Sequence, residues 1–288
     1  MNETGQDGAS RPRFSNIDAW GMSHAGHVRK DNQDHFFVGA IARTDRVVAV
    51  TATEEQQLGD GVERLASLAI VADGVGGVSD GGEAARVAVR ELLSAVTRFF
   101  EAGVAAGPDD PDAFSRLLHE AALSCHEFLL QRVRDEGGGR RFATTLTLFL
   151  GLWPHAYLLQ VGDSRCYIFR DGELTQLTRD QTMAQDMVDS GVMTRTVAER
   201  SQWANVLSSA MGGEQAAPVV TRVVRDWGTV VLLCSDGLTR HVSDDAIRDR
   251  LAAMTGSRQV AEQLVADALD GGGTDNITVV IGRTLAPQ

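Results

Sequence analysis

The sequence contains few cysteines and no cysteine motif. Its three cysteines, Cys125, Cys166 and Cys234, are far apart, and no Cys-x-x-Cys pair occurs. An odd number of scattered cysteines argues against both a disulfide framework and a cysteine-based zinc site. We therefore expect a protein of a reducing compartment, with the cytoplasm as the default location.

The sequence also lacks a long hydrophobic run. Its longest uncharged stretch, residues 142–161, includes three threonines and a glutamine. Two strands joined by a turn at Pro154-His155 explain this stretch better than a membrane span does.

Residues 1–14 are polar and lack the apolar core of a signal peptide. They are predicted to form a disordered tail, and residues 285–288 a short C-terminal tail.

Positive charge is in deficit. The chain has 27 basic and 39 acidic residues, a formal net charge of −12, and its only lysine is Lys30. This balance disfavours nucleic acid as a partner, because phosphate backbones attract surfaces rich in Lys and Arg. A phosphorylated substrate would need local cations or metal ions that reverse the sign at the site. Acidity that serves only solubility is an equally good explanation of the charge.

The remaining composition is that of a folded protein with a sizeable core, since 43% of the 288 residues are hydrophobic and 23% are charged. Without a linker or repeat, residues 15–284 are predicted to form one domain. Alternating and β-branched runs predict strands at Ile17–Ser23, His35–Ala42, Val47–Thr51, Ala66–Ala72, Thr144–Leu152, His155–Val161, Arg165–Arg170, Val219–Val224, Thr229–Cys234 and Ile277–Gly282. The Asp171-Gly172 pair predicts a tight hairpin turn.

Helical spacing of apolar residues predicts two long adjacent helices, over residues 85–99 and 114–128. Shorter helices are predicted at Thr182–Ser190, Asp244–Met254 and Arg258–Leu269, the last with Ser257 as its N-terminal cap. Residues 54–63 are predicted to form a polar loop. Because strands and helices are segregated along the chain, the pattern indicates an α+β fold of two packed sheets with helices outside.

Five aspartates stand at the ends of predicted buried strands: Asp34, Asp73, Asp163, Asp236 and Asp275. Any one of them alone is best explained as a turn residue, because Asp-Gly is common turn chemistry. If the strands share two sheets, however, their ends converge, and clustered carboxylates repel one another unless cations neutralise them. Oxygen ligands favour hard ions such as Mg²⁺ or Mn²⁺. Gly74 would let its backbone carbonyl approach such an ion.

Two divalent ions about 3.5–4 Å apart can activate a water molecule and stabilise an in-line displacement. This chemistry suits the hydrolysis of phosphate esters. It requires neither a Ser or Cys nucleophile nor an activating His.

At these residues the sequence resembles the metal-dependent type 2C protein phosphatases, the PPM family, and in particular its compact bacterial members. The resemblance covers roughly residues 16–283, and its motifs occur in the family's order. Each block alone is a weak signal, whereas the ordered set is specific. The blocks are Gly26-His27-Val28-Arg29-Lys30-Asp31-Asn32-Gln33-Asp34, Val71-Ala72-Asp73-Gly74-Val75-Gly76-Gly77, Ala143-Thr144-Thr145-Leu146, Val161-Gly162-Asp163-Ser164-Arg165, Leu177-Thr178-Arg179-Asp180-Gln181, Leu207-Ser208-Ser209-Ala210-Met211-Gly212, Leu233-Cys234-Ser235-Asp236-Gly237-Leu238 and Gly273-Thr274-Asp275-Asn276-Ile277-Thr278.

The resemblance implies a four-layer α-β-β-α sandwich of two mostly antiparallel sheets, and a site with two core Mn²⁺ or Mg²⁺ ions. Asp73 would bridge the ions with help from the carbonyl of Gly74. Asp236 and Asp275 would complete the first site. Asp34 would serve the second site, and Asp163 would bind a third, looser ion.

The resemblance also implies that Arg29 clamps the substrate phosphate with its planar fork, and that Asn276 orients its neighbours from behind the metal ligands. Taken singly, Arg29 could be a solvated surface residue and Asn276 a turn residue. Residues 183–205 would form a flap over the site, or else a surface segment without function.

Several positions depart from the family pattern. Gln33 stands where Glu is frequent, Ala143 replaces a frequent Gly, and Val78 replaces a His common in bacterial members. Val75 stands where some members have a His proposed as the general acid. The general acid therefore remains unassigned, although no principal metal carboxylate is lost.

The activity implied is hydrolysis of phosphoserine and phosphothreonine in proteins, by in-line attack of a metal-bridging water or hydroxide without a phosphoenzyme. The substrates would be those of a Ser/Thr kinase in signal transduction, and the enzyme a monomer without nucleic acid or membrane partners. Two alternatives remain open: a pseudophosphatase that acts as a regulatory binding module, and a phosphatase for small phosphate esters.

Overall fold

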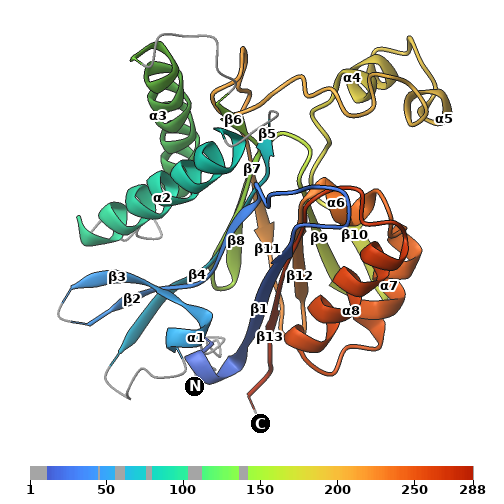
Figure 1. Ribbon diagram of the computed structural model, residues 1–288. Helices are drawn as coiled ribbons and strands as arrows, with labels where there is room; N and C mark the ends of the chain where they lie inside the picture. The colour runs from blue at the N-terminus through green and yellow to red at the C-terminus, as the bar shows by residue number, and fades with distance from the viewer. Residues whose placement is uncertain are drawn as a thin grey trace, which may run out of the picture.

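The computed structural model describes residues 12–44, 46–55, 62–75, 80–102, 112–135 and 142–287. Most of the predicted N-terminal tail, the Gly76-Gly77 pair and Val78 of the second motif, and the last residue of the C-terminal tail lie outside the described residues. Two antiparallel sheets pack face to face with helices on both outer sides (Figure 1). The predicted α+β sandwich is therefore confirmed.

The first sheet has five strands, each paired antiparallel with its neighbours. In spatial order they are β1 (Ile17–His24), β13 (Ile277–Thr284), β12 (Val230–Cys234), β9 (Arg165–Arg170) and β10 (Glu173–Gln176). The predicted hairpin joins β9 to β10. Asp171 and Gly172 have φ values of 52° and 85°, the left-handed conformation that such a turn requires.

The second sheet has six antiparallel strands. In spatial order they are β11 (Val219–Val224), β8 (His155–Val161), β7 (Leu146–Leu152), β4 (Glu63–Ala72), β2 (His35–Arg43) and β3 (Val47–Thr51). The predicted strand from Thr144 is interrupted at Thr145. Its first part, β6 (Ala143–Thr144), pairs instead with β5 (Gly74–Val75), which follows β4. This small ladder lies at one end of the sandwich (Figure 1).

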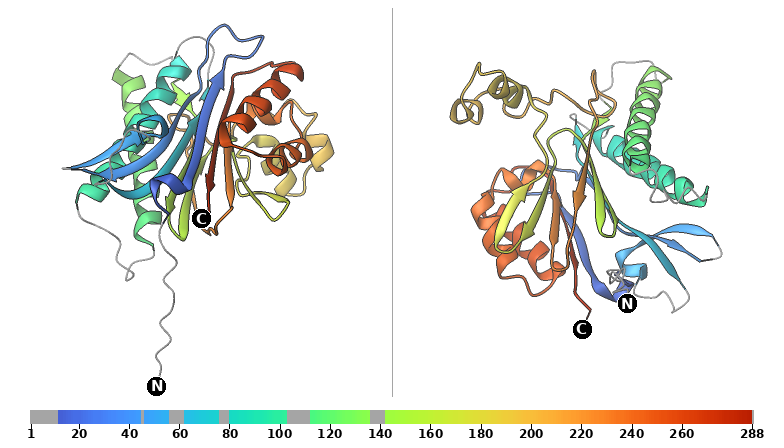
Figure 2. Two further views of the ribbon diagram at one scale, coloured as in Figure 1. Left: turned by 90° about the horizontal axis from the view of Figure 1, so that it is seen from below. Right: turned by 180° about the vertical axis from the view of Figure 1, so that it is seen from behind.

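Two long helices, α2 (Asp80–Glu101) and α3 (Ala113–Asp135), cover the outer face of the six-stranded sheet. The other sheet is covered by α6 (Asp236–Thr239), α7 (Asp244–Ala252) and α8 (Ser257–Asp270). Figure 2 shows the same layers from two further sides. The remaining helical segments are the 3-10 turn Phe14–Asn16, α1 (Ala52–Glu55), α4 (Met183–Asp189) and α5 (Arg195–Ala198).

Alternation along the strands divides the apolar residues between the layers. On β7, Leu148 and Leu150 pack toward α2 and α3, whereas Phe149 lies between the two sheets. On β12, Leu232 packs toward α8 and Leu233 faces the other sheet. Because successive side chains of a strand point to opposite faces, each sheet packs against the other sheet on its inner face and against helices on its outer face.

Two local predictions were wrong. The segment predicted as a loop over residues 54–63 begins in α1 and ends in β4, and residues 56–61 between them lie outside the described part. Ser257 is not the cap of the last helix but its first residue, and Gly256 is the cap. The Ser257 hydroxyl instead donates to the backbone oxygen of Asp18 at 2.8 Å, so it joins α8 to β1. That contact spans 239 residues and leaves no local signal.

The predicted flap contains α4 and α5, which stand away from the sandwich at the end that carries β5 and β6 (Figure 1). None of the described helices combines the length and the apolar composition that a membrane crossing requires.

Candidate metal and phosphate site

Strand register brings the five predicted aspartates to one end of the sandwich. His35 pairs with Ala72, so Asp34 and Asp73, which adjoin them, become neighbours. Cys234 pairs with Val279, which places Asp236 and Asp275 at the same end of two adjacent antiparallel strands. A fifth strand, β8, ends at Val161 and places Asp163 there as well. Residues up to 241 positions apart thus meet, because in an antiparallel pair the end of one strand lies beside the start of the next.

The carboxylates are close enough to perturb one another. Burial, followed by the negative charges of Asp34 and Asp236, raises the pKa of Asp73 well above its usual value. Burial also raises the pKa of Asp163 and of Asp236, and that of Asp34 to about 6. Without cations the cluster therefore favours protonated carboxyls, as expected for like charges crowded in a poorly solvated site.

Hydroxyl groups hold the Asp34 carboxylate and the Asp73 backbone in place. The side chain of Asp34, which is only 5% exposed, accepts hydrogen bonds on Oδ2 from Ser235 at 2.8 Å and Thr278 at 2.6 Å. The backbone at Asp73 is held by Thr145, whose Oγ1 accepts from the Asp73 amide at 3.0 Å. The Thr144 hydroxyl donates to the Asp73 carbonyl at 2.8 Å. The Asp34 carboxylate and the Asp73 backbone are therefore held in place before any ligand binds.

Gly74 has a packing role that the sequence did not reveal. A Cβ atom there would lie 2.3 Å from the carbonyl carbon of Gly81, at the start of α2. The close approach of two glycines lets the helix begin directly behind the Asp73 turn. Whether the Gly74 carbonyl also binds an ion stays a prediction.

Two arginines contribute positive charge to the cluster. Arg29 donates to Asp275 Oδ2 at 2.7 Å, yet 53% of its side chain is exposed. Arg240 pairs with Asp236 and lies 3.3 Å from Asp275 Oδ2. The exposed Arg29 fork retains donors that face solvent, which a bound anion could engage.

Asn276 connects the loop that carries Arg29 to the rest of the site. Its Oδ1 accepts from the Gln33 amide at 2.9 Å, and its Nδ2 donates to the carbonyls of Ala25 and Asp31, each at 3.0 Å. The Asn276 amide also donates to Asp275 Oδ1 at 3.0 Å. The Asn276 side chain thus positions the Arg29 loop, and the Asn276 backbone amide positions the Asp275 carboxylate.

The donor set fits hard divalent cations. Asp34 Oδ1 and Asp236 Oδ1 are buried and have no hydrogen-bond partner in the described structure, which leaves lone pairs directed into the cluster. Among the described residues, no group of three or more His, Cys, Asp or Glu side chains is arranged so that it could hold a metal ion. The guanidinium groups of Arg29 and Arg240 instead neutralise Asp236 and Asp275.

Comparison with known proteins decides the family. The family model described as Protein phosphatase 2C matches residues 57–270. The chain belongs to the protein phosphatase 2C family. It is 34% identical over 243 residues to the Ser/Thr protein phosphatase PstP of Mycobacterium tuberculosis, a match that covers 83% of this chain and 44% of PstP. It therefore spans less than half the length of that relative.

A second relative and a solved structure of PstP give similar results. The Ser/Thr phosphatase stp of Listeria welshimeri is 30% identical over 215 residues, covering 74% of this chain and 83% of stp. A solved structure of the PstP catalytic domain in complex with two manganese ions has a TM-score of 0.70 and 29% identity. That match covers 94% of this chain and 99% of the PstP domain.

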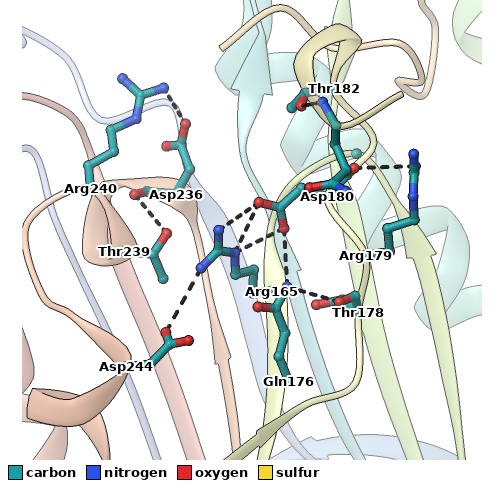
Figure 3. A network of polar contacts seen from close by, with 12 residues as sticks. Arg165, Gln176, Thr178, Arg179, Asp180, Thr182, Asp236, Thr239, Arg240 and Asp244 are labelled. Atoms are coloured by element: carbon teal, nitrogen blue, oxygen red, sulfur yellow. Dashed lines mark hydrogen bonds and ion pairs between the residues drawn. The ribbon is translucent and has the colours of Figure 1, made fainter. Parts of the chain in front are cut away.

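In this phosphatase 2C family member, Arg240 belongs to the site but was not among the residues predicted from the sequence. Its signal was present, because Asp236 and Arg240 are four residues apart and α6 places them on one face (Figure 3). The supporting hydroxyls of Ser235 and Thr278 were missed as well. Their hydrogen bonds to Asp34 span 201 and 244 residues, so only the assembled sheets reveal them.

Asp180 was left outside the predicted site, and the structure gives it a structural role. Its carboxylate binds the Arg165 guanidinium through both oxygens, at 2.7 to 3.1 Å (Figure 3). The adjacent Arg179 pairs with Asp186 at 2.7 Å and Asp189 at 2.5 Å on α4. This network therefore joins β9 to the base of the predicted flap.

Proposed function

We propose that this chain is a metal-dependent phosphatase that hydrolyses phosphoserine and phosphothreonine in proteins. The observation that carries the proposal is the convergence of five aspartates, from strands far apart in sequence, with two arginines at one end of the sandwich. Family membership agrees with this reading.

Mn²⁺ or Mg²⁺ would be held by Asp73, Asp236 and Asp275 in one position and by Asp73 and Asp34 in a second, with the carbonyl of Gly74. Asp163 would serve a third ion. When bound, two such ions supply an activated water molecule and neutralise charge on the phosphate. The solved structure of the PstP catalytic domain in complex with two manganese ions supports a dependence on divalent metal ions.

The side chains of the protein supply orientation and charge. Arg29 would hold the substrate phosphate through the guanidinium donors that do not contact Asp275. Ser235 and Thr278 would keep the Asp34 carboxylate in one rotamer, and Asn276 would fix the Arg29 loop relative to Asp275. Reaction geometry would thus be set before the substrate arrives.

We further propose that the substrates are phosphoproteins produced by a Ser/Thr kinase, and that the enzyme acts as a cytoplasmic monomer without nucleic acid or membrane partners. The net charge of −12 supports the absence of a nucleic acid partner. The names of PstP and stp, both Ser/Thr phosphatases, support the substrate class.

The test is phosphate release from a phosphothreonine peptide with Mn²⁺, compared with p-nitrophenyl phosphate. We expect activity that a chelator abolishes, a higher kcat/KM for the peptide, and a loss of at least about 100-fold in Asp73→Asn. The matched control is Asp171→Asn, in the exposed β9–β10 turn. Chelator-resistant turnover, or full activity of Asp73→Asn, would contradict the proposal. Mn²⁺ binding without turnover would indicate a pseudophosphatase.

A further inference from the structure

A small cleft opens between the two sheets, away from the aspartate cluster. It encloses about 50 Å³ and has a mostly apolar lining, contributed by Val38, Leu68, Phe149, Val231, Leu233 and Val280. The start of β1 and the end of β13 also line it. Both lie at the end of the sandwich opposite β5 and α6 (Figure 1).

Arg225, the residue after β11, lines this apolar cleft. It is only 6% exposed, and its guanidinium carbon lies 5.4 Å from the centre of the Phe149 ring. Gly151 on β7 provides the space, because a Cβ there would lie 2.6 Å from Arg225 Nη2. The guanidinium thus lies over the face of β7 that carries Phe149 and Gly151, with the cleft beside it.

The charge of Arg225 has no counter-charge within the described residues. Its Nε atom is buried without a hydrogen-bond partner, and no ion pair joins its guanidinium to a carboxylate of the described chain. Burial, followed by repulsion from Arg64, lowers the pKa of Arg225 to about 10, so it remains protonated at neutral pH. Arg283, which also lines the cleft, is paired with Asp18 at 3.0 Å.

A buried, unpaired cation is costly, and proteins normally pair it or leave it in water. Here the walls are apolar and the open volume is next to the charge. A volume of about 50 Å³ holds three or four water-sized groups. This matches the two oxygens of a carboxylate and a short alkyl chain. The planar guanidinium fork is suited to a carboxylate, and a single cation suits a monoanion better than a phosphate dianion.

We propose that this cleft is a binding site for a short-chain monocarboxylate, of the size of acetate or propionate, held by Arg225. The carboxylate would pair with the guanidinium, and the alkyl group would lie against the apolar walls. Such an anion would stabilise the folded protein by binding it in preference to the unfolded chain. The site is separate from the aspartate cluster and does not depend on the proposed phosphatase activity.

The test measures melting temperature in sodium propionate and in sodium chloride at equal ionic strength, without phosphate. We expect propionate to raise the melting temperature of the wild type by about 3–5 °C. Arg225→Met should lose this rise, and in chloride it should melt at or above the wild-type temperature, because an unpaired buried charge has been removed. Arg222→Met, which alters an exposed arginine on β11 three residues before Arg225, should retain the full propionate response.

A second measurement is independent of how the variant folds. A wild-type crystal soaked in sodium propionate should show difference density for the carboxylate and its short alkyl chain in the cleft beside Arg225, which a crystal soaked in sodium chloride should lack. An equal propionate response in wild type and Arg225→Met would overturn the proposal. So would an empty cleft in the soaked crystal, or a chloride response as large as that of propionate.

Discussion

The two ends of the β-sandwich have opposite charge imbalances. At one end, five aspartates crowd together and two arginines only partly neutralise them. At the other end, a single guanidinium is buried among apolar side chains without a carboxylate of the described residues beside it. In each case a ligand of opposite charge would relieve the imbalance, divalent cations at the first end and an organic anion at the second.

The comparison teaches how the two imbalances differ in origin. The acidic end is assembled from strand ends and turns, where hydroxyl donors orient the Asp34 carboxylate and a backbone donor orients the Asp275 carboxylate. The basic end is built inside the sandwich from one long side chain against β7. The acidic end is consequently rigid and offers several carboxylates, whereas the basic end offers a single guanidinium group. We expect catalysis from the first and only modest binding from the second.

The largest effect that distinguishes the ends should come from Arg29→Met. Removing the exposed guanidinium beside Asp275 should lower kcat/KM for a phosphopeptide by about 100- to 1000-fold, because the phosphate loses a charged bidentate donor. Steady-state kinetics with Mn²⁺ would measure this. Arg43→Met, which alters an exposed arginine paired with Glu63 at 3.0 Å, is the control and should be neutral. An unaltered kcat/KM in Arg29→Met would show that the phosphate binds elsewhere.

A smaller effect is expected from Asn276→Ala. The variant loses the bonds that hold the Arg29 loop at Gln33, Ala25 and Asp31, so kcat/KM should fall by about 10- to 100-fold. Because Arg29 itself remains, the loss should be smaller than in Arg29→Met, and combining the two changes should add little. Fully additive losses would indicate that Asn276 acts independently of the loop.

Arg240→Met should increase the affinity for metal ions, whereas the two preceding variants should lose activity. The Arg240 guanidinium competes with cations for Asp236 and Asp275, so its removal should tighten Mn²⁺ binding by about 3- to 10-fold. Calorimetric titration would measure this, with Arg248→Met on α7 as a matched control at an exposed ion pair. Weaker Mn²⁺ binding in Arg240→Met would mean that the arginine supports the site rather than occupying it.

The smallest effect concerns pH in the metal-free protein. The pKa of Asp34 is raised to about 6 in the folded state, so between about pH 4 and 6 the folded protein binds more protons than the unfolded chain. Stability in chelator should therefore fall by a few degrees in melting temperature as pH rises from 5 to 7.5. Mn²⁺ should stabilise the protein more at pH 7.5 than at pH 5.5, since protons compete for the carboxylates. A melting temperature in chelator that rises with pH would contradict the crowding of the buried aspartates.

The sequence predicted the parts of this molecule that follow a local period. Alternation located nearly all the strands, and three- and four-residue spacing located α2 and α3. The aspartates were recognisable because they directly adjoin strands whose ends must meet. The resemblance to a family added the roles of individual ligands, which spacing alone could not supply.

What the sequence could not predict depends on contacts between distant elements. Arg225 looks like any arginine after a strand, and its burial becomes visible only when β7 and the facing sheet are in place. Ser257 reads as a helix cap but contacts Asp18 across 239 residues. The break at Thr145 likewise results from pairing of Thr144 with Gly74. In each case tertiary contacts override a correct local preference.

The central claim is that Asp34, Asp73, Asp236 and Asp275 together bind divalent ions. Anomalous diffraction at the manganese edge, from crystals soaked in Mn²⁺, tests it most directly. The account predicts at least two manganese peaks, one of them within about 2.3 Å of an oxygen of Asp73 and of Asp236. An absence of peaks among these carboxylates at saturating Mn²⁺, with Arg240 still paired to Asp236, would contradict it.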